Sequence, residues 1–139
     1  MEEKNKYYIT TAIPYVNAKL HIGNVVDWLC ADILARHHRS LGEKVMFSLG
    51  ADQHGEKNLE KAQEAGLDPK VYVDGMADKF NDIFEAYNIR PDRFIKTSDE
   101  AHKQRVQIIW DKLKPHIYKG KYVGAYCVGC EEFKTETHV

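Results

Sequence analysis

The segment Ala12–Asn24 contains the residues best suited to bind a phosphate group. His21, Gly23 and Asn24 lie between a predicted strand and a predicted helix. The N-terminus of a helix presents unpaired backbone N–H groups and the positive end of its dipole, so it favours an anion. A bare His-x-Gly sequence also fits a structural role, in which Gly23 only enters the helix and His21 is a solvated loop residue.

Asp52 is the candidate carboxylate, because it follows a second apolar run and could face the same crevice as His21. A fixed anion at this point is suited to a cationic ligand group. The spacing also allows a simpler interpretation, in which Asp52 is a turn residue beside Gly50 and Gly55.

Two cysteines have metal-ligand spacing. Cys127 and Cys130 form a Cys-x-x-Cys pair in a glycine-bearing stretch, which predicts half a zinc knuckle that needs two further ligands. Cys30 is predicted to be a packed core thiol. Three cysteines in a chain without an export signal do not indicate a disulfide framework.

The composition predicts an ordinary folded domain. The chain has 139 residues, of which 43% are hydrophobic, with 20 basic and 21 acidic side chains. This composition excludes a disordered or fibrous protein, and the length leaves little room for a second complete domain. A net charge of -1 means that nucleic-acid binding requires a local patch. Without a signal peptide or an apolar run of ~20 residues, we expect a cytoplasmic protein without a membrane partner.

The first elements predicted are a strand, a helix and a strand. Residues 6–13 are rich in aromatic and β-branched types and end at Pro14, residues 23–41 have helical periodicity, and residues 44–49 form a short apolar run. This βαβ unit places ligands at the carboxyl ends of its strands. The predicted core face of the helix comprises Val26, Leu29, Cys30, Ile33, Leu34 and His37.

Helices and a hairpin are predicted beyond this unit. A helix is expected over 56–65, and a longer one begins after Asp68 and continues as one core stripe to Tyr87. Thr97 and Glu100 have the spacing of a capping box before a further helix. After Gly120 the alternating, glycine-rich sequence favours a hairpin.

Taken with its context, the first loop resembles the N-terminal signature of class I aminoacyl-tRNA synthetases. Their His-Ile-Gly-His motif follows the first strand of a nucleotide-binding fold; here the fourth position is Asn24. Within that class, three segments resemble the methionyl-tRNA synthetase family: residues 14–17, 31–36 and 50–55. An asparagine can still donate to a phosphate oxygen, although it carries no charge.

The resemblance implies an α/β fold with two parts. Residues 1–117 would form the first half of a Rossmann-like parallel-sheet nucleotide-binding domain, and residues 118–139 the start of a connective insertion. In the family the cysteine pair belongs to the zinc-knuckle hairpin of that insertion, so Cys127 and Cys130 are the implied zinc ligands. The other two ligands would lie beyond Val139.

The resemblance also implies roles for individual residues. The catalytic residues would be His21 and Asn24. ATP, with Mg²⁺, would be bound by His21, Gly23, Asn24 and Asp27, and methionine by Ala12, Ile13, Tyr15 and Asp52. Asp27 also has a simple explanation as an acid that complements the helix dipole.

The implied activity is that of a methionine–tRNA ligase. Methionine is activated by ATP to methionyl-adenylate and then transferred to tRNA(Met), which requires the remaining half of the fold, so this fragment alone is expected to be inactive. Two alternatives stay open: a non-catalytic ligand-binding or interaction module that keeps the motifs, and a nucleotidyltransferase of the wider superfamily.

Overall fold

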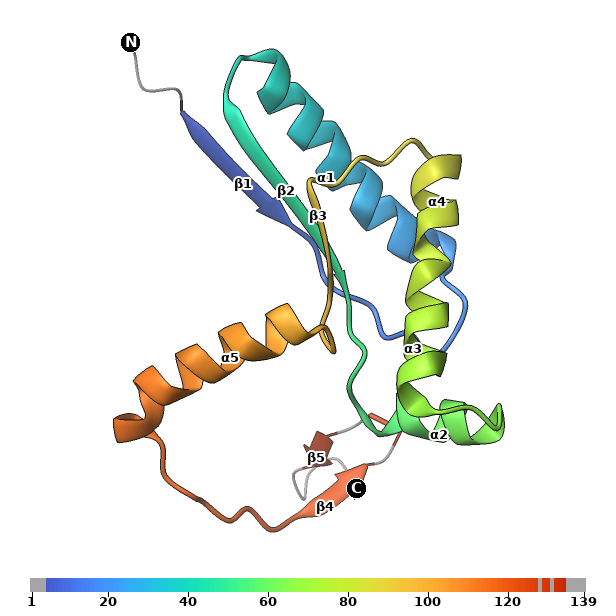
Figure 1. Ribbon diagram of the computed structural model, residues 1–139, viewed down its shortest axis with the longest axis vertical. Helices are drawn as coiled ribbons and strands as arrows, with labels where there is room; N and C mark the ends of the chain where they lie inside the picture. Colours follow the sequence, from blue (N-terminus) through green and yellow to red (C-terminus); the bar gives the residue numbers. More distant parts are fainter. Residues whose placement is uncertain (1–4, 128, 131, 135–139) are drawn as a thin grey trace. The chain divides into compact units, whose positions relative to one another are not determined.

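The computed structural model describes residues 5–127, 129–130 and 132–134. The chain divides into two compact units, Met1–Gln107 and Ile108–Val139. The expected hairpin strands belong to the second unit, and the three strands of the larger sheet belong to the first (Figure 1). In the described part of the chain, no helix has both the length and the apolar content needed to cross a bilayer.

The elements follow one another as an α/β chain with a final hairpin. Their bounds are β1 Lys6–Thr10, α1 Ile22–Ser40, β2 Lys44–Ala51, α2 Glu56–Glu64, α3 Pro69–Asp78, α4 Phe80–Ala86, β3 Arg93–Lys96, α5 Glu100–Leu113, a 3-10 turn Lys114–His116, β4 Ala125–Cys127 and β5 Glu132–Lys134.

Strand β2 lies at the centre of a three-stranded parallel sheet of order β1-β2-β3. Tyr8 pairs with Met46 on one side of it, and Gly50 pairs with Ile95 on the other. The predicted βαβ unit is therefore confirmed. Strand β3 was not expected, because four residues between two helices are too short to show a strand period. All three strands end at the same edge, where a ligand site is expected.

The predicted core face of α1 is wrong except for Leu29, which is half-buried against the core. The helix buries Val25, Trp28, Ala31, Asp32 and Ala35. By contrast, Val26 is 51% exposed and Ile33 is 63% exposed, and Cys30 is exposed rather than packed in the core. The true face has the same helical period but uses alanines, which let the helix approach the sheet closely. Counting large apolar residues selected the neighbouring face instead.

An aromatic cluster joins α1 to the rest of the first unit. The ring of Trp28 lies 5.4 Å from that of Phe80 and 5.3 Å from that of Phe84. On their other side, the same two phenylalanines contact Phe94 of β3 at 5.8 and 5.4 Å. Helices α1, α3 and α4 therefore gather on one face of the sheet around this core (Figure 1).

A buried carboxylate provides the second link. Asp32 is 4% exposed, accepts a hydrogen bond from the backbone N–H of Arg90 at 2.8 Å, and pairs with Arg36. Arg36 also donates to the carbonyl of Asn88. These bonds tie α1 to the segment between α4 and β3 and satisfy a charge that would otherwise be costly to bury.

The predicted helix from Asp68 to Tyr87 is interrupted. Asp68 caps α3 as expected, accepting from the backbone N–H groups of Lys70 and Val71. The helical hydrogen-bond pattern is then interrupted at Lys79, between α3 and α4. The φ of −65° and ψ of −15° at Lys79 nevertheless keep the backbone in a right-handed helical conformation. Val73, Ala77, Phe80 and Phe84 therefore still face one core.

The capping box predicted at Thr97 is also wrong. Helix α5 begins at Glu100, and the Thr97 hydroxyl instead accepts a hydrogen bond from the backbone N–H of Gln53 at 2.8 Å. No residue of α5 is buried, and its apolar side chains Val106, Ile109, Trp110 and Leu113 are exposed in this structure.

The helix face can be tested by a matched pair of substitutions in this chain. We expect Trp28→Ala to lower the free energy of unfolding by about 3–5 kcal/mol, because it removes the buried ring that α1 contributes to the aromatic cluster. Ile33→Ala should change it by less than about 0.5 kcal/mol, as for an exposed site. Urea denaturation followed by circular dichroism measures both. Equal losses for the two variants would contradict the assigned face.

Candidate active site

The first loop of the site connects the end of β1 to the beginning of α1, and His21 is the N-cap of that helix. Its Nδ1 accepts a hydrogen bond from the backbone N–H of Gly23 at 3.1 Å. In return, the side-chain Oδ1 of Asn24 accepts from the backbone N–H of His21 at 3.2 Å. The two side chains thus form a reciprocal capping box.

This cap determines which atoms His21 and Asn24 can offer a ligand. Because Nδ1 of His21 acts as an acceptor, the ring proton lies on Nε2, which can donate. Because Oδ1 of Asn24 is also used within the cap, its amide nitrogen is left as the donor. Both predicted phosphate-binding side chains therefore present N–H groups at a helix N-terminus, where an anion is favoured.

Gly23 fits the same geometry. A Cβ added there would lie 3.0 Å from both Cε1 and Nδ1 of the His21 ring. A side chain at this position would push the imidazole by a few tenths of an ångström. The glycine thus makes room for His21 to fold over the helix end, besides leaving the backbone accessible.

A hollow of about 300 Å³ lies over this loop. It is lined by Pro14, Tyr15, Asn17, Ala18, Lys19, Leu20, His21 and Asn24. Tyr15, expected at the methionine site, is therefore brought beside the two expected phosphate-binding residues. Asp27 does not line this hollow; it is exposed and lies beyond the first turn of α1, which contains no acidic residue. The dipole explanation for Asp27 is therefore wrong.

Asp52 lies directly beyond the end of β2 and is joined to the first loop. Its backbone N–H donates to the carbonyl of Pro14 at 2.9 Å, and it forms a parallel bridge with Tyr15. One carboxylate oxygen, Oδ1, accepts from the backbone N–H of His54 at 3.3 Å. The other oxygen has no hydrogen-bond partner among the described residues. Asp52 is thus a half-buried turn residue that still has an acceptor available.

The expected apolar contacts for methionine border this carboxylate. Ile13 is 42% exposed and Tyr15 is 38% exposed, and Ala12 is exposed as well. A Cβ added to Gly50 would lie 2.8 Å from Cγ2 of Ile13, so Ile13 packs directly onto β2 next to Asp52. An anion edged by accessible apolar surface suits a ligand that has both a cationic and an apolar part.

Sequence reasoning did not single out the buried polar residues that support Asp52. Asn58 is 2% exposed, and its Nδ2 donates to the carbonyls of Asp52 at 3.1 Å and of His54 at 2.9 Å. Gln53 is 5% exposed and bonds to Thr97 and Ser98 beyond β3. The only sequence signal was their place in and after the Asp-Gln-His-Gly turn.

The two cysteines lie on the hairpin of the second unit. Strands β4 and β5 pair antiparallel, as predicted, with Cys127 opposite Glu132. The pKa of the Cys127 thiol is lowered, chiefly by a hydrogen bond from the backbone of Cys130 and next by one from its side chain. A lower pKa favours the thiolate, which is the form that binds metals. Among the described residues, no group of three or more candidate ligands could hold a metal ion.

Residues 7–139 match the family model described as tRNA synthetases class I (M). The chain belongs to this family. It is 46% identical over 138 residues to a methionine–tRNA ligase of Clostridium tetani, and 46% identical over 136 residues to that of Thermotoga maritima. These alignments cover 98% and 96% of this chain.

A solved structure of this synthetase family has the same fold. Mycobacterium tuberculosis methionyl-tRNA synthetase in complex with methionyl-adenylate matches with a TM-score of 0.88 and 36% identity, over 96% of this chain and 26% of that one. The α/β fold with its parallel sheet is therefore that of the family's Rossmann-like domain. The chain spans about a fifth of the length of the curated relatives it matches, 22% for both ligases named above.

Proposed function

We propose that this chain is the N-terminal part of a methionine–tRNA ligase that works in the cytoplasm. The observation that carries the proposal is the arrangement at one sheet edge: a helix N-terminus with two N–H donors and a half-buried carboxylate beside apolar side chains. The family membership of the chain supports the same activity.

In the proposed reaction the carboxylate of methionine attacks the α-phosphorus of ATP, and pyrophosphate leaves. The methionyl group then passes to the terminal ribose of tRNA(Met). ATP enters as its Mg²⁺ complex, in which the metal neutralises phosphate charge. His21 and Asn24 hold and stabilise the phosphates, and Gly23, which has no side chain, lets the phosphates approach the helix end, so catalysis is mainly positioning and electrostatic stabilisation. Asp27 is proposed to reach the ribose of the nucleotide.

We propose that methionine is recognised by a carboxylate, which binds its ammonium group, and by apolar residues, which contact its side chain. Asp52 accepts a charge-assisted hydrogen bond from the α-ammonium group. Ala12, Ile13 and Tyr15 contact the thioether side chain, which suits an apolar, aromatic-edged surface. In this proposal residues 1–117 are the first half of the catalytic domain, and residues 118–139 begin the connective insertion. Activity then requires the remaining half of the synthetase fold.

We also propose a zinc site on the hairpin. Cys127 and Cys130 would supply two thiolates of a tetrahedral set, and zinc bound there would hold the hairpin together. The lowered pKa of Cys127 fits this donor chemistry. Two further ligands would have to come from elsewhere in the complete ligase.

The role of His21 can be separated from its capping function. In the complete ligase we expect His21→Ala to lower the rate of adenylate formation by ~100- to 1000-fold, the usual loss for one preorganised donor. His21→Asp should lose at least as much, although aspartate is a good N-cap, because a carboxylate has no N–H to donate. Methionine-dependent pyrophosphate exchange and single-turnover kinetics measure this. Full activity in His21→Asp would show that the histidine acts only as a helix cap.

Asp52→Asn tests the ammonium contact, because the amide keeps the shape and loses the anion. Methionine affinity should fall at least about tenfold, as expected for a charge-assisted hydrogen bond, while ATP affinity changes little. Calorimetric titration of each ligand decides this. An unchanged methionine affinity would mean that Asp52 is only a turn residue. An equal loss of affinity for methionine and for ATP would indicate a collapsed loop.

Zinc content tests the hairpin proposal. This 139-residue chain should retain little zinc after dialysis against a weak chelator, whereas the complete ligase should retain it tightly and lose it in Cys127→Ser. Stoichiometric zinc in the short monomeric chain would instead bring Glu131 or His138 into the ligand set; both lie outside the described residues. Zinc retained by the serine variant would exclude Cys127 as a ligand.

A further inference from the structure

The residues around Asp52 are held by neighbours on both sides after the regular pairing of β2 ends at Ala51. On the β1 side, the backbone N–H of Asp52 donates to the carbonyl of Pro14 at 2.9 Å. On the β3 side, the backbone N–H of Gln53 donates to Oγ1 of Thr97 at 2.8 Å. Two successive peptide groups are therefore fixed to opposite neighbours.

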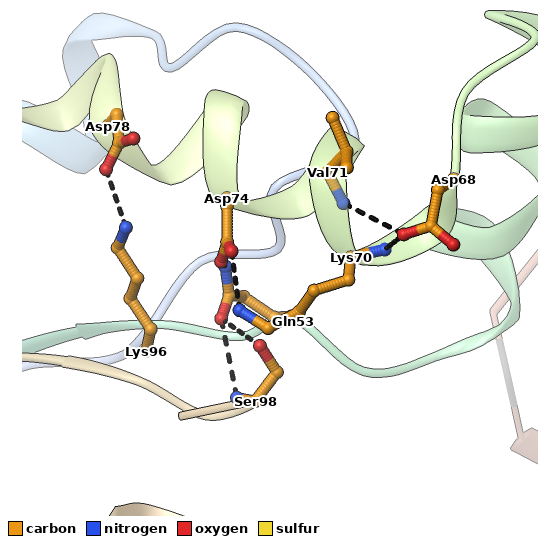
Figure 2. A network of polar contacts seen from close by, with 8 residues as sticks. All are labelled: Gln53, Asp68, Lys70, Val71, Asp74, Asp78, Lys96 and Ser98. Carbon is orange, nitrogen blue, oxygen red and sulfur yellow. Dashed lines mark hydrogen bonds and ion pairs between the residues drawn. The ribbon is translucent and has the colours of Figure 1, made fainter. Parts of the chain in front are cut away.

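The side chain of Gln53 joins two further elements (Figure 2). Its Nε2 donates to Oδ1 of Asp74 on α3 at 3.0 Å. Its Oε1 accepts from the hydroxyl of Ser98, beyond β3, at 2.7 Å, with the backbone N–H of Ser98 at 3.4 Å. Gln53 is 5% exposed and Ser98 6%, so these bonds form away from solvent.

The chemistry of its partners determines how the amide of Gln53 is oriented. Lys70 pairs with the other oxygen of Asp74 at 2.5 Å, and this hydrogen bond lowers the pKa of the Asp74 carboxyl. An ionised carboxylate only accepts, so the NH₂ end of Gln53 must face it. The Ser98 backbone N–H only donates, so the carbonyl end faces Ser98. A glutamate would place a second anion against Asp74, and a leucine could make neither bond.

Anchoring Gln53 also determines which way Asp52 faces. Successive side chains of an extended chain point to opposite faces, and the exposure of residues 51 to 53 alternates in this way: buried, half-buried, buried. With Gln53 held on the inner side, the side chain of Asp52 is turned to the opposite, more exposed side. A slip of one residue would exchange the two side chains.

We propose that Gln53 is a positioning residue for methionine binding, which holds the Asp52 carboxylate in place through its bridge between Asp74 of α3 and Ser98 beyond β3. The inference rests on the proposed function of Asp52. Asp74 acts indirectly: it orients Gln53 and is not among the residues proposed to contact the ligand. The affinity for methionine thus depends on how α3 is seated against the sheet edge.

Helix α3 provides a matched control for this test. Asp74 and Asp78 lie one turn apart, and each pairs with a lysine, Lys70 and Lys96 respectively, but only Asp74 contacts Gln53 (Figure 2). In the complete ligase, Gln53→Ala and Asp74→Ala should weaken methionine binding about tenfold and leave ATP binding within about twofold. Asp78→Ala should change neither affinity. Asp74→Asn, which keeps an acceptor for Gln53, should regain most of the methionine affinity.

Calorimetric titration measures the affinity of each variant for methionine and for ATP, and thermal unfolding shows whether the variant is folded. Should Gln53→Ala fail to fold, Asp74→Ala at the edge of the network decides the question. Unchanged methionine affinity in Asp74→Ala, or equal weakening of both ligands, would overturn the positioning role. If Asp52→Asn still weakens methionine in that case, the proposed function stands. If Asp52→Asn has no effect either, the ammonium contact itself fails.

Discussion

The parallel pairing of β2 with both β1 and β3 is the constraint on which the rest of the first unit depends. Parallel strands end at the same edge, so the segments that follow them are brought together although they are distant in sequence. His21 comes after β1, Asp52 after β2 and Ser98 after β3. The pairing is stabilised from one face by Trp28, Phe80 and Phe84, whose rings fill the space between α1 and the strands.

At the phosphate end of the site, helix capping and ligand binding use different atoms of the same two side chains. His21 and Asn24 use one acceptor each to satisfy backbone N–H groups, and the cap leaves their side-chain N–H donors unused. Such a division explains why an uncharged residue suits position 24. The amide completes the cap through Oδ1 and leaves its nitrogen as an N–H donor for a ligand.

At the other end, the position of Asp52 is set by buried polar groups rather than by the sheet ladder alone. Asn58 and Gln53 are each nearly inaccessible to solvent, and their amides are bonded to the turn or to neighbouring elements. Bonds of this kind are directional and costly to leave unpaired, so they fix a loop more narrowly than apolar contacts do. Because these buried amides hold the turn, the accessible carboxylate of Asp52 keeps its orientation even without a ligand.

The sequence by itself determined the βαβ unit, the hairpin, the helix start at Asp68 and the family, because strand periods, glycine and proline positions and the His21 and Asp52 motifs are local signals. Only the tertiary structure decided which face of α1 is buried, since close approach to a sheet favours Ala31 and Ala35 over the larger Ile33 and Leu34. It also decided that Thr97 bonds to Gln53 instead of capping a helix, and that Gln53, Asp74 and Ser98 meet. Those contacts join residues more than twenty positions apart, and no short-range pattern records them.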